Sequence, residues 1–447
     1  MALTALDIEA KLPLTPNQIG GLATEDEDGS AFLTFAQVNF VGEKWCELNM
    51  QRALNTLVVH HDALRVQEYC QEGKLGQRLM THGAAAVEYV DCRGVSVLSM
   101  TSELQLAFQR TQKHINEKCP CLLSLLVVQL SDDELHGLIV VHHSMGDGFS
   151  MQFFAQQLEE LYQGNRTLLD NDRSLSYREY CERLQAYAKS EQVAVVLERL
   201  SRNDAYNRQI PLIICDAPDE DFIGRDSVKE GVTISRPELR NVSVQQVEQA
   251  VLRAVALTCL ESEQNELQLD YVVNGRAVQF AEGELDGTMG WLSHHAFLLL
   301  SKARLKSQNW QQWLAGEVAL AKSDSIATQI LQHGKYYGLE GGNALAVPKV
   351  VVNLNVQRGL TLEKNVFSSL FDHTTGFGDT VKKPFSLYFI VNFAPDMERL
   401  ELFMEYSHRQ FESKTVQKLL AQLKLHLEDA FVDLLERNGH LLMSRPV

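Results

Sequence analysis

The sequence has few cysteines and a deficit of positive charge. Only 8 of its 447 residues are cysteine, and most stand singly among apolar or mixed neighbours, which favours reduced core thiols over a disulfide scaffold. Cys119 and Cys121 bracket Pro120, but without a second ligand pair this spacing does not indicate a zinc site. Lysine and arginine number 41 against 58 aspartates and glutamates, a net charge of −17, so we expect no general attraction to nucleic acid or anionic lipid.

Long hydrophobic runs are also absent. No apolar stretch approaches the ~20 residues that a membrane-spanning helix requires, and the first residues lack the basic and then apolar pattern of a secretory signal. We therefore expect a cytoplasmic protein that binds no membrane. Hydrophobic residues make up 45% of the chain and charged residues 22%, as is typical of globular proteins. At 447 residues the chain exceeds what one core usually supports, so two domains are predicted.

Strand-like and helix-like patterns alternate along the chain and predict a mixed α/β fold. The predicted strands lie at 30–41, 121–130, 135–143, 225–235 and 267–278, and the predicted helices at 45–61, 150–164 and 243–262. The polar turn between 121–130 and 135–143 predicts that these two strands pair antiparallel. The polar, helix-prone segment between residues 165 and 225 suits a crossover between two lobes.

The stretch VVHHSMGDGFS, residues 140–150, is the strongest candidate for a functional site. It places His143 at the end of an apolar strand, and histidine, with an ordinary pKa of ~6.5, can accept a proton near neutral pH. Gly146 and Gly148 would allow unusual backbone angles and a close approach of substrate. A helix starting near Ser150 would direct unpaired N–H groups at developing negative charge.

Two other interpretations of this stretch compete with a general base. His143 and Asp147 are four residues apart and would share one face of a helix as metal ligands, but the glycines disfavour a helix there and no further ligand lies at a suitable spacing. We therefore expect no metal. A strand-end histidine can also be a satisfied polar residue, and an Asp-Gly pair a simple turn. The residues alone leave this alternative open.

The pattern His-His-x-x-x-Asp-Gly at 142–148 resembles the signature of the condensation-domain superfamily of nonribosomal peptide synthetases. Similar elements follow in order: PLTPNQIGG near the start, HHDALRV at 60–66, LDYVVNGR, LDGTMGWLSHH and the closing strands, so that the resemblance runs from about residue 12 to 430. It implies a fold of two chloramphenicol-acetyltransferase-like α/β lobes in a V-shaped pseudo-dimer. The lobes are expected at 1–180, with the motif, and at 181–447.

The resemblance also implies roles for the motif residues. His143 would be the catalytic histidine, which either takes a proton from the attacking amine or orients it and stabilises the tetrahedral intermediate. Gly148 would lend a backbone N–H near the reacting carbonyl, and His142 would be a buried structural residue. Asp147 would form a structural ion pair with Arg276 across the lobes.

Four further residues are weaker candidates for substrate contacts. Ser150 is expected to cap the following helix, with a substrate contact as the alternative. Asn274 stands just before Gly275 in the stretch VVNGR. His294 and His295 lie on a predicted strand, where the simplest expectation is that one is exposed and one packed.

Several segments resemble epimerization domains more than ordinary condensation domains, but Val272 stands where epimerization domains carry a catalytic glutamate. Inversion at a carbon next to a carbonyl calls for two proton-transferring groups, and valine supplies none. We therefore expect a condensation enzyme on an epimerization-like frame. Epimerization of a carrier-bound aminoacyl thioester and a non-catalytic docking role are the alternatives.

The expected reaction joins an acyl or aminoacyl thioester, held on a carrier protein, to an amine, with ester formation as a variant. No adenylation or carrier segment is recognised in the sequence, so a free-standing acyltransferase that meets its carrier protein in trans is expected. The amine acceptor would be a small molecule or itself carrier-bound. No cofactor is expected in the chain, because phosphopantetheine would arrive on the carrier protein.

Overall fold

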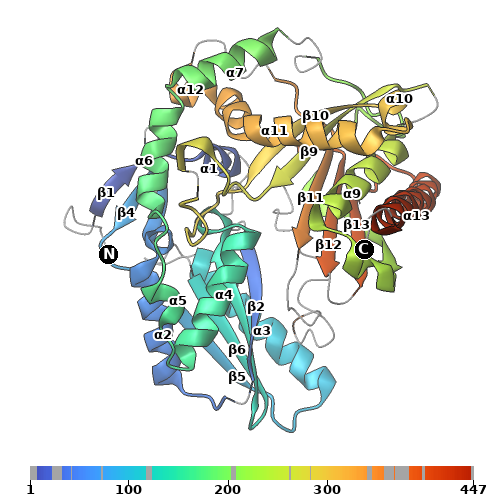
Figure 1. Cartoon of the computed structure of the whole chain (residues 1–447). Coiled ribbons are helices and arrows are strands. Elements are labelled where there is room, and N and C mark those ends of the chain that lie inside the picture. Colours follow the sequence, from blue (N-terminus) through green and yellow to red (C-terminus); the bar gives the residue numbers. More distant parts are fainter. Residues whose placement is uncertain are drawn as a thin grey trace. The chain divides into compact units, whose positions relative to one another are not determined.

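The computed structural model describes most of the chain (Figure 1). The described residues are 8–22, 33–41, 43–71, 74–116, 123–202, 208–260, 263–281, 283–339, 345–356, 367, 382–394 and 398–443. Two compact units divide them: unit 1 comprises 1–190, 274–293 and 363–378, and unit 2 comprises 191–273, 294–362 and 379–447. The predicted assignment of acyltransferase-like lobes to 1–180 and 181–447 stays a prediction, and residue 180 lies inside a helix of unit 1, Tyr177–Tyr187.

Unit 1 contains two sheets and the helices that cover them (Figure 1). A three-stranded antiparallel sheet has the order β1-β4-β3, and a four-stranded sheet has the order β2-β7-β6-β5, in which only β5 and β6 pair in parallel. The strands are β1 (Ile8–Leu12), β2 (Leu33–Val41), β3 (Val66–Gln71), β4 (Lys74–Met80), β5 (Ala86–Asp91), β6 (Leu123–Ser131) and β7 (Glu134–His142). The helices are α1 (Pro16–Leu22), α2 (Glu47–His60), α3 (Val97–Asn116), α4 (Gly148–Tyr162), α5 (Thr167–Asp170) and α6 (Tyr177–Tyr187), with 3-10 turns at Asp62–Arg65, His143–Met145 and Gln279–Ala281.

Strands β6 and β7 form the centre of unit 1. Both are mostly apolar, and nearly all their residues are buried, as expected for strands covered on both faces. Helix α3 packs its Leu104 and Phe108 in one cluster with Leu126 and Val140 of these strands, while α4 packs on β2. The predicted antiparallel pair is therefore confirmed, and so is the helix predicted at 45–61, which is observed as α2.

Unit 2 is built on one mixed sheet of six strands in the order β10-β9-β11-β12-β13-β8. Strand β11 pairs in parallel with both β9 and β12, and the outer pairs are antiparallel. The strands are β8 (Ser227–Ser235), β9 (Glu266–Val273), β10 (His294–Ser301), β11 (Val350–Val356), β12 (Leu387–Ala394) and β13 (Arg399–Ser407). The helices are α7 (Glu191–Ser201), α9 (Val244–Cys259), α10 (Lys302–Leu305), α11 (Trp310–Gln332), α12 (Gly334–Tyr337) and α13 (Ser413–Met443), with 3-10 turns at Gly224–Asp226 and Pro237–Asn241.

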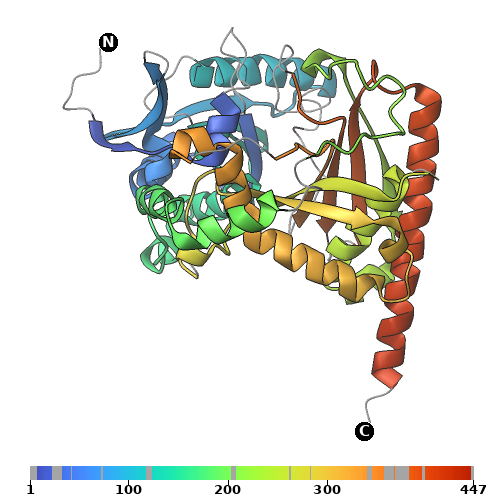
Figure 2. The same cartoon turned by 90° about the horizontal axis from the view of Figure 1, so that it is seen from above.

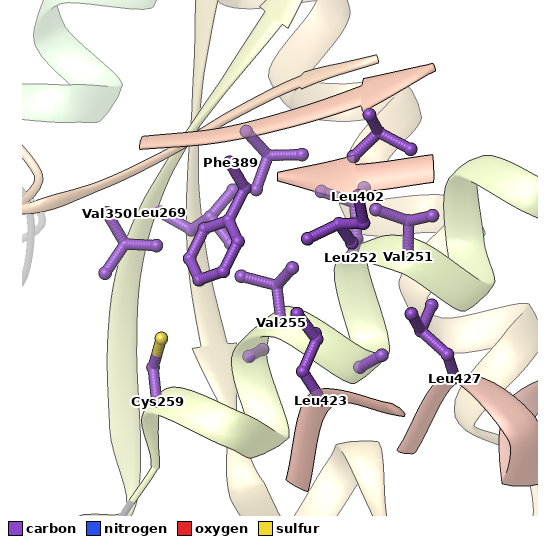
Figure 3. Close-up of a cluster of buried hydrophobic side chains, with 14 of the residues drawn as sticks. Val251, Leu252, Val255, Cys259, Leu269, Val350, Phe389, Leu402, Leu423 and Leu427 are labelled. Atoms are coloured by element: carbon purple, nitrogen blue, oxygen red, sulfur yellow. The ribbon is translucent and has the colours of Figure 1, made fainter. Parts of the chain in front are cut away.

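One face of this sheet carries the core of unit 2. Alternate residues of the strands, such as Leu269, Phe389 and Leu402, meet the apolar faces of α9 and α13 (Figure 3). Figure 2 shows α13 as the long red helix beside this sheet. Helix α9 matches the predicted helix at 243–262, and its capping box at Ser243 explains where it starts.

Two features bear on the remaining sequence predictions. The strand predicted at 267–278 ends at Val273, because Gly275 adopts a left-handed backbone conformation, with φ +68°, that leaves the sheet. Five cysteines of the described residues are free thiols, four of them buried, whereas Cys119 and Cys121 lie outside the described residues. No helix in the described part of the chain has the length and hydropathy to cross a bilayer.

Candidate active site

The candidate site lies at the corner between β7 and α4 in unit 1. Strand β7 ends at His142, a 3-10 turn runs from His143 to Met145, and α4 begins at Gly148. Nδ1 of His142 lies 2.5 Å from Oγ of Ser144. It also accepts the backbone N–H of Ser144 at 3.4 Å. His142 thus ties down the turn that presents His143, although its side chain is half-buried rather than buried as predicted.

The residue that caps α4 is Asp147, not Ser150, so that prediction was wrong. Oδ1 of Asp147 accepts the N–H of Ser150 at 2.9 Å. Ser150 instead lies within the first turn and is fully buried. Its Oγ donates to the carbonyl of Gly290 at 2.9 Å and receives hydrogen bonds from Gly290 N–H at 3.2 Å and from Arg276 at 2.7 Å. A buried serine with these partners connects two chain segments.

The glycines that need special backbone angles are also different from those predicted. Gly146 has an extended φ of −171°, which any residue adopts, and Gly148 has no positive φ. In the segment 274–293, positive φ angles occur instead at Gly275 (+68°), Gly283 (+74°) and Gly290 (+153°). This segment belongs to unit 1 although its sequence neighbours on each side belong to unit 2.

Asp147 and Arg276 form a buried ion pair that joins this segment to the corner. Nη1 of Arg276 donates to Oδ2 of Asp147 at 2.5 Å, and Arg276 and Asp147 are 5% and 3% exposed. Oδ2 also accepts the backbone N–H groups of Leu292 at 3.0 Å and Ser293 at 2.8 Å. The expected pair is therefore present, and it joins residues from the two ranges predicted as lobes. Both partners belong to unit 1, because that unit includes residues 274–293.

The two terminal nitrogens of the Arg276 guanidinium meet further acceptors. Besides Asp147 and Ser150, they donate to the backbone carbonyls of Asn274 at 2.7 Å and Thr288 at 3.3 Å, and the guanidinium carbon lies 4.7 Å from the centre of the Phe149 ring. Burial, the largest influence on Asp147, would raise the pKa of its carboxyl, but the charge and hydrogen bonds of Arg276 and the Ser150 hydrogen bonds together hold that pKa below its ordinary value. Asp147 is therefore an anion at neutral pH.

His143 packs against Trp291 of the same segment. The two rings have centroids 4.3 Å apart and planes inclined by 50°. Burial lowers the pKa of His143 from 6.5 to about 4, and the carboxylate of Asp147 offsets this only in part. The imidazole is therefore neutral at pH 7, the state in which it can accept a proton.

The N-terminus of α4 follows directly. Gly148 is exposed and is the first residue of the helix. Its N–H therefore belongs to the first turn, where N–H groups have no carbonyl partner within the helix. The first turn carries no acidic side chain of its own. A neutral imidazole and the positive end of a helix thus lie within five residues of each other.

The other candidate residues fall into different surroundings. Asn274 is exposed in unit 1, and its side chain accepts the N–H of Arg276 at 3.2 Å. In unit 2, His294 is buried, 2% exposed, with Nδ1 3.5 Å from Oγ of Ser325, while the side chain of His295 is 33% exposed and pairs through Nδ1 with Asp270 at 2.7 Å. His294 is therefore packed as expected, while His295 is partly buried rather than exposed.

Trp291 is the residue that the sequence patterns did not single out. It stands between Gly290 and Leu292 in an apolar stretch, where an aromatic residue is indistinguishable from core. The only signal was its place after a glycine in the segment that resembles the second-lobe core. Its contact with His143 depends on a chain path that periodicity does not reveal.

Comparison with known proteins shows what this chain is similar to. The family model of the condensation domain matches residues 8–197, which include the corner. The chain is 21% identical over 411 residues to a plipastatin synthase of Bacillus subtilis (strain 168), and 24% identical over 448 residues to bacitracin synthase 3 of Bacillus licheniformis. The chain is thus similar to condensation domains, with the family match confined to residues 8–197.

These matches cover 87% and 93% of this chain but 16% and 7% of the two synthases, so the chain spans about a sixth of the first relative's length and less of the second's. Among solved structures, the epimerization domain from the third module of tyrocidine synthetase B superposes with a TM-score of 0.76 at 17% identity, covering 97% of this chain and 100% of that one. A condensation domain for chain release from the enacyloxin polyketide synthase gives 0.69 at 16% identity, covering 96% and 85%. The predicted fold class, α/β with chloramphenicol-acetyltransferase-like lobes, is thereby confirmed.

Proposed function

We propose that the protein forms an amide bond between an acyl or aminoacyl group, delivered as a thioester on a carrier protein, and an amine acceptor. The observation that carries this proposal is the neutral imidazole of His143 beside the N-terminus of α4. A proton acceptor and a set of N–H donors are the two elements that acyl transfer from a thioester to an amine requires. The phosphopantetheine thiol of the carrier would be the leaving group.

Each proton in this reaction has a defined path. The acceptor nitrogen attacks the thioester carbonyl carbon, and His143 takes the N–H proton as the new C–N bond forms. The carbonyl oxygen becomes an oxyanion, which the N–H of Gly148 at the start of α4 stabilises. The C–S bond then breaks, and the imidazolium returns its proton to the departing thiolate. An acceptor hydroxyl would follow the same path and yield an ester.

Carrier proteins loaded with candidate acyl groups, incubated with amines, test this proposal directly. We expect amide product from the native protein and a loss of roughly 10²–10⁴-fold in rate for His143→Ala, the usual contribution of general acid–base catalysis. His82→Ala is the matched control, because His82 is an exposed histidine of the same unit. Equal rates for native and His143→Ala proteins would remove His143 from the mechanism, and no product with any pair would favour the docking role.

Epimerization of a carrier-bound aminoacyl group is the second candidate, and one observation favours it. His295 lies directly opposite Val272 in the antiparallel register of β9 and β10, so a titratable ring shares the sheet face of the valine. Burial, the largest influence, lowers the pKa of His295, but the charge and hydrogen bond of Asp270 together raise it above 6.5. Incorporation of solvent deuterium at the α-carbon without any acceptor, lost in His295→Gln, would support epimerization; no incorporation would support condensation.

A further inference from the structure

The indole of Trp291 covers part of the imidazole that the proposed reaction depends on. Their ring centroids are 4.3 Å apart, which is the distance of direct aromatic contact. An indole at that distance leaves no room for water between the rings, so one side of the His143 ring is desolvated. The contact joins residues 148 positions apart in sequence (291 − 143 = 148).

The backbone around Trp291 is held on both sides by residues of the motif. On one side, the carbonyl of Gly290 accepts the N–H of Asp147 at 3.2 Å and the hydroxyl of Ser150 at 2.9 Å. On the other side, the N–H groups of Leu292 and Ser293 donate to Oδ2 of Asp147. The indole therefore has little freedom to move relative to the corner that carries His143.

Helix α1 supports the other end of the indole. A methyl group added at Gly21 would lie 2.9 Å from Cζ3 of Trp291, closer than carbon atoms pack in proteins. The side chain of Asn17, one turn earlier in α1, donates to the carbonyl of Ser293. Trp291 is thus confined between α1 and the β7–α4 corner.

We propose that Trp291 is a positioning residue of this enzyme, whose indole fixes the orientation of the His143 ring and keeps water from one of its faces. The proposal rests on the proposed role of His143 as proton acceptor. It gives the buried pair of Asp147 and Arg276 a second task, because that pair acts on the reaction by holding the backbone of Trp291.

The protonation of His143 supplies the readout. Its pKa is about 4 because of burial, and the charged or titratable groups that act on it are Asp147, which raises this pKa, and His142, which lowers it. Removal of the indole admits water, so the pKa of His143 should rise toward its ordinary value of about 6.5. A rate that depends on the neutral imidazole would then fall as the pH drops below about 6.5.

Chemical modification of His143 tests this without any substrate. Diethyl pyrocarbonate reacts with the neutral imidazole, and tandem mass spectrometry reports the rate at His143 itself. Between about pH 5.5 and 8 we expect a flat rate in the native protein, and in Trp291→Leu a rate at pH 5.5 about tenfold below its own plateau, the neutral fraction for a pKa near 6.5. Trp45→Leu is the control, since Trp45 stacks on Tyr89 in unit 1.

The conservative variant separates positioning from a loss of folding. Trp291→Phe keeps an aromatic cover and should restore a flat profile, while Gly21→Ala, which displaces the indole, should reproduce the defect in part. In the acyl-transfer assay, Trp291→Leu should lower kcat at least tenfold with little change in KM. A flat modification profile in a folded Trp291→Leu protein would overturn the proposal. If Trp291→Leu shows the shifted profile but the native protein transfers no acyl group, the proposed function would be refuted and the positioning role of Trp291 would stand.

Discussion

At the scale of single residues, Asp147 connects more groups than any other side chain of the corner described above. Its two carboxylate oxygens accept three backbone N–H groups and one guanidinium N–H while the residue is 3% exposed. A buried ion pair adds little net stability, because desolvation of two charges offsets their attraction. Its value here is geometric, since one carboxylate sets the start of α4 and the path of residues 290–293.

Loss of Asp147 should be costly because it leaves Arg276 charged and buried without its partner. We predict that Asp147→Ala lowers the free energy of unfolding by about 3–5 kcal/mol, measured by urea denaturation. Asp91→Ala should change it little, since Asp91 pairs with Arg93 at an exposed surface. A midpoint for Asp147→Ala equal to that of the native protein would contradict the structural role of the pair.

Buried neutral histidines should make the protein less stable in mild acid. Burial lowers the pKa of His61 to about 4, despite a hydrogen bond between its Nε2 and Gln157 at 2.7 Å, and His143 has a similar value. Between about pH 6.5 and 4 the unfolded chain binds protons that the folded chain does not, so stability falls as the pH falls. Each histidine contributes up to about 1.4 kcal/mol per pH unit in this window.

His61→Gln should therefore reduce the slope of unfolding free energy against pH between about pH 5 and 6.5 by up to about 1.4 kcal/mol per unit. Urea denaturation at several pH values measures the slope separately from any overall loss of stability. His82→Gln, at an exposed position, should keep the native slope. An unchanged slope in His61→Gln would mean that the ring has the same pKa in the folded and unfolded protein, which would contradict the effect of burial.

At the scale of elements, the segment 274–293 depends on a glycine that no other residue can replace. Gly275 has φ +68°, and a β-carbon there would lie 1.6 Å from the carbonyl oxygen of Leu292. Both the backbone angle and the close approach exclude a side chain. This close approach brings Arg276 and Leu292, two partners of Asp147, to the same place.

Two glycine substitutions should have opposite effects. Gly275→Ala should destabilise the protein by several kcal/mol, roughly 3 or more, because the segment must move away from the corner. Gly316→Ala, at an exposed position in α11 with no atom within 4 Å of the new methyl group, should stabilise it by about 0.4–1 kcal/mol. Thermal denaturation of both proteins gives the signs, and equal effects would contradict this account.

The sequence predicted well those elements whose patterns are local. The apolar runs of β6 and β7 and the helical spacing in α2 were identified because burial on two faces or one imposes a regular pattern. The pattern does not decide the cap of α4, because capping depends on which of several polar side chains reaches the helix start, and here it is Asp147 rather than Ser150. The pairing of Asp147 with Arg276 came from family resemblance, since spacing cannot predict a contact between residues so far apart. Trp291 had no pattern of its own.

At the scale of the whole molecule, the two units are interleaved in sequence. Unit 1 needs the segment 274–293, which follows β9 of unit 2 and precedes β10. The partners of Asp147 from this segment are Arg276, Leu292 and Ser293. The first 190 residues therefore contain the motif but lack most of the groups that satisfy its carboxylate.

A fragment of residues 1–190 should for this reason fail to fold cooperatively. It would leave the carboxylate of Asp147 near an apolar core without its cation, at a cost of several kcal/mol, about 3–5. Asp147→Ser in the same fragment should recover part of the structure, because serine keeps a helix cap without a charge. Circular dichroism during urea titration measures both, and a cooperative transition in the unsubstituted fragment would contradict the prediction.

The interleaving of residues 274–293 also constrains how such proteins diversify. A single crossover between two related genes anywhere in 191–273 would combine the motif at 142–148 from one parent with the segment 274–293 from the other. Functional hybrids are then expected only where both parents share the residues that correspond to Asp147, Arg276 and Gly275. Recombination that exchanges 1–190 together with 274–293 would preserve the contacts between these two segments. We therefore expect the two segments to be inherited together.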